Sequence, residues 1–299
     1  MDGNGYNRRD FMKVAGLGGL VFASGLPGCA NYGQAGSGQH DFFFVQLSDV
    51  HWGYNNAKVN PEAKGTLRKA VAGVNSLEEK PDFVVFTGDL TQTTDDPKLR
   101  RQRLAEFREQ AAELKVPKVY FFAGEHDASL DRGEAYQEVI GGPLYYTFDH
   151  KGVHFIVLDN TSDPAPILGG KQIEWLKADL AGRKPDDPIV VLTHRPLFPL
   201  LPQWDWATRD GDAAVAALMP YKNVTVFYGH IHNEHHHYTG HIEHHAAKAV
   251  MFPLSPAGTA PQKTQLPWDP ARPYAGLGFR SVRASAASAE PKVREFPLG

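Results

Sequence analysis

The chain has 299 residues, 42% hydrophobic and 22% charged, a composition typical of a globular protein with one large domain or two small ones. The formal net charge of -3 argues against a nucleic-acid-binding protein, which normally carries a basic face, so no nucleic-acid polymer is expected as a partner. The single cysteine excludes a disulfide bond within the chain.

The N-terminal segment, residues 1–29, has the features of an export signal. Arg8 and Arg9 form a twin arginine, and a weakly apolar, glycine-rich stretch follows them. This pattern resembles a twin-arginine signal, and LPGC at its end resembles a lipoprotein cleavage site that would make Cys29 the lipidated first residue. We therefore expect export by the twin-arginine machinery, a location in the periplasm or on the outer face of the membrane, and anchoring by lipid.

The alternative interpretation of this segment is a short hydrophobic N-terminal helix or anchor. Between Val14 and Cys29 there are too few apolar residues for a membrane-spanning helix, which needs about 20. Residues 30–40 are predicted to form a flexible tether, and residues 41–299 a single domain.

Five apolar runs along the domain each end in ionisable residues. The runs are continuous rather than alternating, as expected for strands that are covered on both faces. In chain order they are FFFVQLSDVH, ending in Asp49 and His51; DFVVFTGDL, ending in Asp89; VYFFAGEHD, ending in Glu125, His126 and Asp127; PIVVLTHRP, with His194; and NVTVFYGHIH, with His230 and His232.

Other elements lie between and after these strands. Helical spacing of apolar residues predicts helices over 61–79, 96–114, 169–182 and 210–220. Residues 144–159 are typical of a hairpin that turns at 150–152. The C-terminal part predicts three further strand regions, HHHYTGHIEHH, AKAVMFP and GLGFRSVRAS, and a long proline-rich loop at 253–274.

The shared position of the ionisable residues predicts one functional site. In an open α/β sheet, functional residues gather at the carboxyl ends of the strands. Each fragment is weak by itself, because Asp-x-His or Gly-His-x-His arises often by chance, and a lone histidine on an apolar strand is usually a core residue. Five such ends in succession are hard to explain by packing. Mixed carboxylate and imidazole ligands suit Mn²⁺, Fe and Zn²⁺.

The same motifs resemble those of a known superfamily. Asp49-x-His51, Gly88-Asp89, Gly124-Glu125-His126-Asp127, His194 and Gly229-His230-x-His232 resemble the calcineurin-like metallophosphoesterases. QLSDVHWG and DFVVFTGDLT resemble especially the class III cyclic-nucleotide phosphodiesterase branch. The resemblance covers about 42–250 and implies an α/β fold, a four-layer αββα sandwich with two mixed sheets flanked by helices.

The resemblance also implies a centre of two metal ions about 3.5–4 Å apart. Its ligands would be Asp49, His51 and His232 for one ion, Glu125, His194 and His230 for the other, and Asp89 for both. A hydroxide held between the ions would attack phosphorus, and His126 would contact the phosphate or protonate the departing alkoxide. Asp127 would orient a neighbour or cap the next element.

Residue 125 departs from the superfamily pattern, which has Asn at this position, whereas this chain has Glu125. Three outcomes are physically open. The carboxylate can ligate the second ion directly, it can favour a trivalent ion such as Fe³⁺, or it can turn away and leave that site weak. We expect direct ligation, because an oxygen donor is still available at this strand end.

Further side chains near the motifs have open interpretations. Trp204 and Trp206 could stack on a nucleobase or pin a loop to the body of the protein. The residues 54–56, Tyr-Asn-Asn, are candidates for substrate contact. Seven of the 14 histidines lie between His232 and His245, and we interpret those that follow His232 as an exposed polar strand rather than a further metal site.

Together these observations predict metal-dependent hydrolysis of a phosphodiester or phosphomonoester of a small molecule, with nucleotides as candidates. The expected cofactors are two divalent or mixed-valence ions of Mn, Fe or Zn. The alternative is a non-catalytic protein outside the cytoplasm that binds or stores metal on the same fold.

Overall fold

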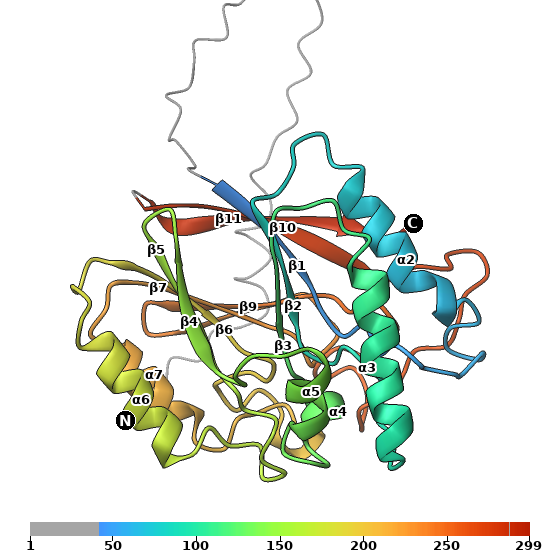
Figure 1. Cartoon of the computed structure of the whole chain (residues 1–299), viewed down its shortest axis with the longest axis horizontal. Coiled ribbons are helices and arrows are strands. Elements are labelled where there is room, and N and C mark those ends of the chain that lie inside the picture. Colours follow the sequence, from blue (N-terminus) through green and yellow to red (C-terminus); the bar gives the residue numbers. More distant parts are fainter. Residues whose placement is uncertain (1–41, 287) are drawn as a thin grey trace, which may run out of the picture. The chain divides into compact units, whose positions relative to one another are not determined.

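The computed structural model describes residues 42–286 and 288–299 (Figure 1). The predicted export signal, the lipidation of Cys29 and the tether at 30–40 lie outside these residues. The division of the chain into signal, tether and one domain stays a prediction.

Two mixed sheets form the centre of the described part. The first has the order β11 (Ser288–Pro297), β10 (Gly278–Ser285), β1 (Phe42–Leu47), β2 (Phe83–Thr87) and β3 (Val119–Phe122). The second has the order β4 (Tyr146–His150), β5 (Val153–Val157), β6 (Pro188–Leu192), β7 (Asn223–Tyr228), β9 (Ile242–Ala246) and β8 (His235–Thr239). Strands β1 to β3, and β5, β6, β7 and β9, run parallel, so their carboxyl ends point the same way within each sheet.

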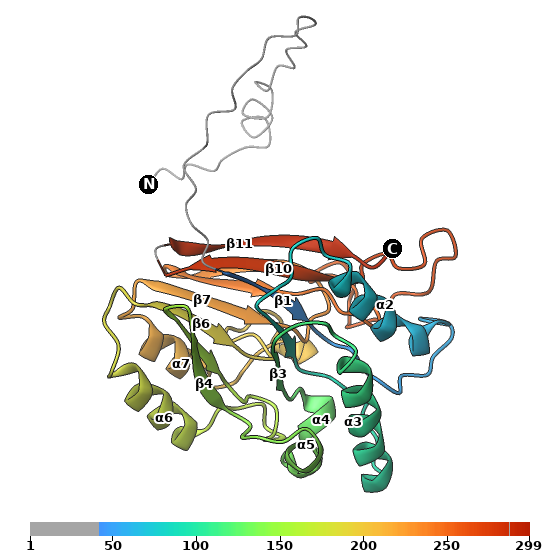
Figure 2. The same cartoon turned by 45° about the horizontal axis from the view of Figure 1, so that its top comes forward.

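Helices cover the outer faces of both sheets (Figures 1 and 2). Helices α2 (Ala63–Asn75) and α3 (Pro97–Ala111) pack on the first sheet, and α6 (Gly170–Leu180) and α7 (Gly211–Leu218) on the second. Two short helices, α4 (Glu125–Ala128) and α5 (Glu134–Val139), follow β3, and a 3-10 turn spans Pro202–Trp204. The predicted four-layer arrangement is confirmed. Within the described ranges, no helix has the length and apolar character needed to span a membrane.

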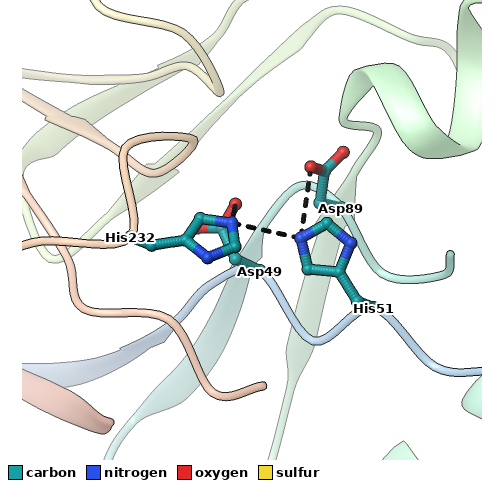
Figure 3. Close-up of side chains that lie close together, drawn as sticks. All are labelled: Asp49, His51, Asp89 and His232. Carbon is teal, nitrogen blue, oxygen red and sulfur yellow. Dashed lines mark hydrogen bonds and ion pairs between the residues drawn. The ribbon is translucent and has the colours of Figure 1, made fainter. Parts of the chain in front are cut away.

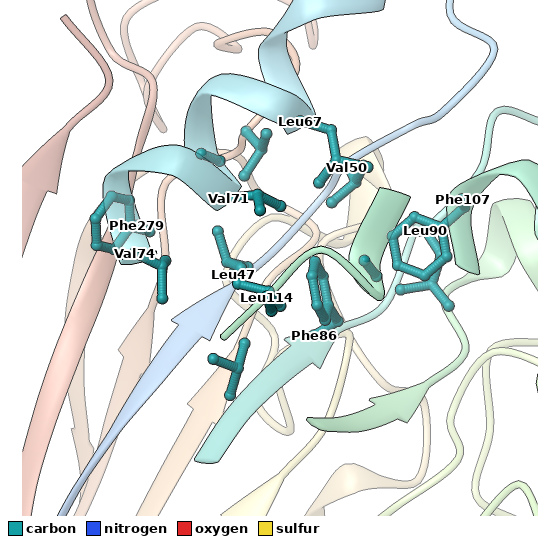
Figure 4. Close-up of a cluster of buried hydrophobic side chains, with 14 of the residues drawn as sticks. Leu47, Val50, Leu67, Val71, Val74, Phe86, Leu90, Phe107, Leu114 and Phe279 are labelled. Carbon is teal, nitrogen blue, oxygen red and sulfur yellow. The ribbon is translucent and has the colours of Figure 1, made fainter. Parts of the chain in front are cut away.

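Aromatic side chains fill the space between the sheets. Phe44 stacks on Phe83 with ring centroids 5.0 Å apart, and both meet Phe155 edge-to-face. A second cluster lies between the first sheet and its helices, where Phe86 meets Phe107 edge-to-face (Figure 4). Strands such as β1 and β2 are therefore buried on both faces, which explains their unbroken apolar sequences.

The four predicted helices and the hairpin of β4 and β5 are confirmed, and each helix is shorter than predicted. Helix α3 shows why a helix begins where it does. The carboxylate of Asp96 accepts hydrogen bonds from the backbone N–H groups of Lys98 and Leu99, and Pro97 occupies the first helical position, where no N–H is needed.

Two expectations about strands were wrong, and one strand was not predicted. Strand β3 is a half-buried edge strand rather than one covered on both faces. Residues 247–253 are apolar because they are buried, but they form a loop whose backbone bonds to the end of β1, with Val250 N–H 2.9 Å from the carbonyl of Ser48. Strand β11 was not predicted, because polar and charged residues, together with Pro291, interrupt its apolar pattern.

Candidate metal centre

All seven predicted ligands lie at the carboxyl ends of parallel strands. Asp49 and His51 follow β1, Asp89 follows β2, Glu125 follows β3, His194 follows β6, and His230 and His232 follow β7. Side chains from both sheets therefore meet at one edge of the sandwich, as the order of the motifs predicted.

Tight backbone turns point these side chains inward. Asp49, His51, Asp89, His230 and His232 have φ values of 54°, 44°, 49°, 66° and 57°, in the left-handed region that residues other than glycine rarely adopt. Hydrogen bonds to neighbouring strand ends hold this conformation, for example His51 N–H to the carbonyl of Asp89 at 2.8 Å. Backbone strain of this kind concentrates at functional sites, where the surrounding structure enforces it.

The first group of side chains contains Asp49, His51, Asp89 and His232 (Figure 3). The Nε2 atoms of His51 and His232 lie 3.1 Å apart. Nε2 of His232 is 3.3 Å from Oδ1 of Asp49, and Nε2 of His51 is 3.5 Å from Oδ2 of Asp89. All four residues are buried, so these polar atoms face one another rather than water.

The second group contains Asp89, Glu125, His194 and His230. Nε2 of His194 is 2.9 Å from Oε2 of Glu125, and Nδ1 of His230 is 3.0 Å from Oε1 of the same carboxylate. Glu125 thus points into the group rather than away from it. Asp89 belongs to both groups, as expected for a carboxylate that bridges two ions.

Hydrogen bonds to backbone carbonyls determine which nitrogen carries the proton in two of the imidazoles when these are neutral. His194 Nδ1 donates to the carbonyl of Thr87 at 2.7 Å, and His232 Nδ1 donates to the carbonyl of Phe252 at 2.6 Å. His230 Nε2 lies 2.8 Å from the carbonyl of Asp205, which can only accept, and 3.2 Å from Nη1 of Arg195, which can only donate, so these contacts do not select one tautomer. A neutral imidazole has one N–H, so when the rings of His194 and His232 are neutral, the inward nitrogen of each presents a lone pair.

Inward lone pairs and carboxylates repel one another unless a proton or a cation lies between them. Nε2 of His194 and Nδ1 of His230 are buried without a hydrogen-bond partner, which is the condition that a bound cation would relieve. The residues present therefore fit a pair of metal ions. Within residues 42–286 and 288–299, no third set of three or more such ligands lies equally close together.

The electrostatics of the groups favour cations. Burial opposes ionisation of Asp49 and Glu125, but the imidazoles around them, and for Glu125 also the guanidinium of Arg195, outweigh it and hold the pKa of both carboxyls below their ordinary values. Burial lowers the pKa of His51 to about 3, so this ring is neutral near pH 7. Burial also opposes protonation of His194, but Asp89 and Glu125 raise the pKa of that ring, and a bound cation would take the place of its proton.

His126 lies at the rim of the first group. Its Nε2 is 3.9 Å from Oδ2 of Asp89, and its ring meets that of His51 edge-to-face at 4.6 Å. The backbone N–H of Thr93 donates to Nδ1 of His126 at 3.2 Å, and the Thr93 hydroxyl lies 2.5 Å from the same nitrogen. An N–H can only donate, so Nδ1 is the accepting nitrogen, and the proton of the neutral ring is on Nε2.

Asp127 combines the two functions that its position allowed. Its buried carboxylate accepts from the N–H of Gly124, at the start of α4, and from the N–H groups of Leu90 and Thr91. It therefore caps the helix that carries Glu125 and also holds the loop that follows Asp89.

The other candidate side chains lie outside the two ligand groups. Trp204 and Trp206 are buried and pack edge-to-face 4.9 Å apart, so they pin their loop to the body of the protein. Tyr54 is buried and its hydroxyl donates to Oε1 of Gln265 at 2.7 Å, whereas Asn55 and Asn56 are exposed. His244 and His245 of the histidine-rich hairpin are buried, which corrects the expectation of a wholly exposed polar strand.

Several groups around the centre had no recognised sequence signal. The carbonyls of Thr87, Phe252 and Asp205 orient imidazoles, and any residue type can supply a carbonyl. Arg195 was not singled out, although it directly follows His194 and lies beside Glu125, with Nη2 3.6 Å from Oε2. The one sequence signal for Arg195 was its position as a charged residue at the end of an apolar strand.

Known proteins share this sequence pattern and fold. A cyclic nucleotide phosphodiesterase assigned as probable in Rhodococcus erythropolis is 29% identical over 52% of each chain. A cAMP/cGMP dual specificity phosphodiesterase of Mycobacterium tuberculosis is 29% identical over 64% of this chain and 62% of its own. A serine/threonine-protein phosphatase of Mus musculus is 28% identical over 52% of this chain and 57% of its own. The chain thus spans between half and two thirds of the length of these relatives.

Solved structures with the same fold include a dimetal phosphatase from Danio rerio, with a TM-score of 0.59 and 15% identity over 86% of this chain and 96% of that one. A purple acid phosphatase from yellow lupin has a TM-score of 0.62 and 16% identity over 85% of this chain and 51% of that one. At such low identity these likenesses establish the fold alone. The family model for calcineurin-like phosphoesterases matches residues 44–234, and the chain belongs to this family.

Proposed function

We propose that this protein is a metal-dependent phosphoesterase that hydrolyses a phosphodiester or phosphomonoester of a small molecule. The observation that carries the proposal is the pair of buried ligand groups that share Asp89, in a member of the calcineurin-like phosphoesterase family. In this proposal the two groups hold two ions of Mn, Fe or Zn, and Glu125 is a direct ligand in the second group. Bound ions of this kind polarise the phosphoester oxygens and lower the pKa of water, which provides a nucleophile near neutral pH.

His126 is proposed to protonate the leaving oxygen. Its Nδ1 accepts from Thr93, so the Nε2–H is the group available on the side of Asp89. The imidazole side chain is 27% exposed, which leaves it accessible to a substrate, whereas the predicted histidine ligands are buried. A positioned general acid of this type typically contributes about 10²–10⁴-fold to the rate.

The proposed substrates are nucleotides or other small organic phosphates. Two of the relatives are named as phosphodiesterases of cyclic nucleotides, which supports placing cyclic nucleotides first among those to be tried. The predicted export favours scavenging of phosphoesters outside the membrane, because cyclic nucleotides are made inside the cell. A panel of cyclic nucleotides, nucleotide monophosphates and glycerophosphodiesters distinguishes these possibilities.

The test of catalysis uses bis-p-nitrophenyl phosphate and p-nitrophenyl phosphate with Mn²⁺-loaded protein. We expect turnover by the wild type and a loss of about 10²-fold or more in His126→Ala with unchanged metal content. His241→Ala, at an exposed histidine of the β8–β9 turn, is the matched control and should keep full activity. Stoichiometric metal without turnover in the wild type would favour the alternative, a metal-binding or storage protein.

Export and lipid anchoring are proposed from the N-terminal sequence alone. Replacing Arg8 and Arg9 by lysine should retain the protein in the cytoplasm, and Cys29→Ser should release it from the membrane fraction and abolish labelling with palmitate. An unchanged distribution between cell fractions in both variants would contradict these proposals.

A further inference from the structure

Arg195 is a buried cation at the metal centre, and metal ligation does not account for it. Its side chain is 5% exposed and lies between Glu125 and Asp205. Nη1 donates to the Asp205 carboxylate at 2.5 Å and to the Asp205 backbone carbonyl at 2.8 Å, and it lies 3.2 Å from Nε2 of His230. Nη2 lies 3.6 Å from Oε2 of Glu125. A guanidinium is always charged and its planar fork holds two acceptors in fixed positions, so Arg195 both restrains and neutralises its neighbours.

The position of Arg195 matters because the second ligand group carries several negative charges. Asp89 and Glu125 together bring two negative charges to that group, and Asp49 adds a third close by, with His194 Nε2 only 4.0 Å from its Oδ1. Each extra negative charge raises the attraction for a cation, and raises it more for a trivalent than for a divalent ion, because the energy scales with the product of the charges. A permanent positive charge beside Glu125 offsets part of this negative charge, although Arg195 shares its charge with the carboxylate of Asp205.

We propose that Arg195 is a positioning and specificity-determining residue, which neutralises Glu125 and so tunes the second ligand group to a divalent ion. This inference rests on the proposed function only in assuming that the group binds an ion. Glu125 and Arg195 act as one unit, and the presence of either charge without the other changes the selectivity of the site for ion charge.

The contact with Asp205 offers a purely structural alternative, in which Arg195 only ties the loop at 201–206 to the body of the protein. His230 Nε2 lies 2.8 Å from the same carbonyl of Asp205 and 3.2 Å from Nη1 of Arg195, so loosening this loop would weaken the binding of all ions alike through a disordered imidazole. A charge effect instead changes the ratio of trivalent to divalent affinity, and it reverses when the partner charge is also removed. These two signatures separate the explanations.

The experiment measures metal affinity rather than turnover. Metal-free wild type, Arg195→Gln, Glu125→Gln and the double variant are titrated with Mn²⁺ and with redox-inert Ga³⁺ supplied as its nitrilotriacetate complex. In Arg195→Gln we expect the ratio of Ga³⁺ to Mn²⁺ affinity to rise about tenfold or more, with a lower melting temperature of the metal-free protein. In Glu125→Gln the uncompensated positive charge of Arg195 should weaken Mn²⁺ binding. In the double variant, the Mn²⁺ affinity and the ratio of Ga³⁺ to Mn²⁺ affinity should both return toward the wild-type values.

Two controls accompany these variants. Arg195→Lys keeps the charge and should keep the wild-type affinity ratio. Arg100→Gln removes another buried guanidinium, which bonds Asp131 at 2.7 Å and the carbonyl of Thr94 at 3.0 Å rather than a ligand, and it should lower stability without changing the ratio. If Arg195→Gln does not fold because Glu125 is left without its counter-charge, the double variant removes that cause, and its Mn²⁺ affinity compared with that of Glu125→Gln tests the proposal.

An unchanged Ga³⁺ to Mn²⁺ ratio in Arg195→Gln, or a double variant that binds Mn²⁺ as weakly as Glu125→Gln, overturns the proposal. Its failure is distinct from failure of the proposed function. The latter would appear as absent turnover of aryl phosphates by the metal-loaded wild type, whatever the selectivity of the centre.

Discussion

At the scale of single residues, glycines next to the ligands allow backbone segments to approach each other closely. A Cβ atom on Gly124 would lie 2.1 Å from Oδ1 of Asp89 and 2.2 Å from its backbone nitrogen. A Cβ on Gly229 would lie 2.0 Å from Oγ of Ser48, which itself donates to Asp49. The ligand carboxylates occupy their positions because no side chain competes for that space.

We predict that Gly124→Ala displaces Asp89 and disrupts both ligand groups, since this carboxylate belongs to each. The expected result is loss of at least one bound ion per chain, with a fall in phosphoesterase activity of about 10²-fold or more. Metal analysis of the purified variant provides the measurement.

Gly65→Ala is the matched control for this substitution. Gly65 is an exposed residue in α2, and a Cβ there would meet nothing within 4 Å. The control should retain both ions and gain about 0.5–1 kcal/mol of stability, because alanine favours the helix. Full metal content in Gly124→Ala would show that the crowding at Asp89 is relieved in another way.

At the scale of secondary-structure elements, capping residues determine where the helices that flank the centre begin. Asp127 caps α4, which carries Glu125 at its first position. Asp96 caps α3, which packs Leu104 and Phe107 into the cluster beside the first sheet. A cap replaces hydrogen bonds that the first turn of a helix cannot make internally.

We predict that Asp96→Ala lowers the free energy of unfolding by about 1 kcal/mol, because two backbone N–H groups lose their acceptor. Urea unfolding followed by circular dichroism measures the change. Asp95→Ala removes the same charge one residue earlier and should have a smaller effect. Equal losses in the two variants would indicate a general charge effect rather than capping.

At the scale of the whole described domain, the metal centre joins the two sheets. Asp49, His51, Asp89 and Glu125 follow strands of the first sheet, whereas the other ligands, His194, His230 and His232, follow strands of the second. Ions held between these groups would therefore link both halves of the sandwich. An ion that binds the folded chain but not the unfolded chain stabilises the folded state by mass action.

We predict that chelation of the metal-loaded protein lowers its melting temperature, in a transition that remains cooperative for both sheets. An ion whose free concentration is about 100 times its dissociation constant adds about 2.7 kcal/mol to the free energy of unfolding. This contribution is lost when the chelator removes the ion. Calorimetry with and without EDTA measures the difference, and added Mn²⁺ should restore it. Asp89→Ala, which lacks the shared carboxylate, should respond much less to the chelator; an equal response would contradict a shared centre.

The expectations that proved correct rest on local patterns. Unbroken apolar runs such as FFFVQL predicted strands buried on both faces, and the ionisable residues after them predicted one site at the sheet edge. The expectations that failed concern segments whose conformation or burial depends on other parts of the fold. Residues 247–253 are apolar yet irregular because their backbone bonds to the end of β1, and β3 is half exposed because it ends its sheet.

By itself, the sequence determined which residues could meet at the centre, because parallel strands carry the residues that follow them to one edge. Only the tertiary structure decided how these side chains are held. Thr93 orients His126 across 33 positions of the chain, and a carbonyl of Asp205 orients His230 across 25. Backbone donors and carbonyls have no signature in the sequence, and Arg195 reaches Glu125 only after two strands from different sheets have packed together.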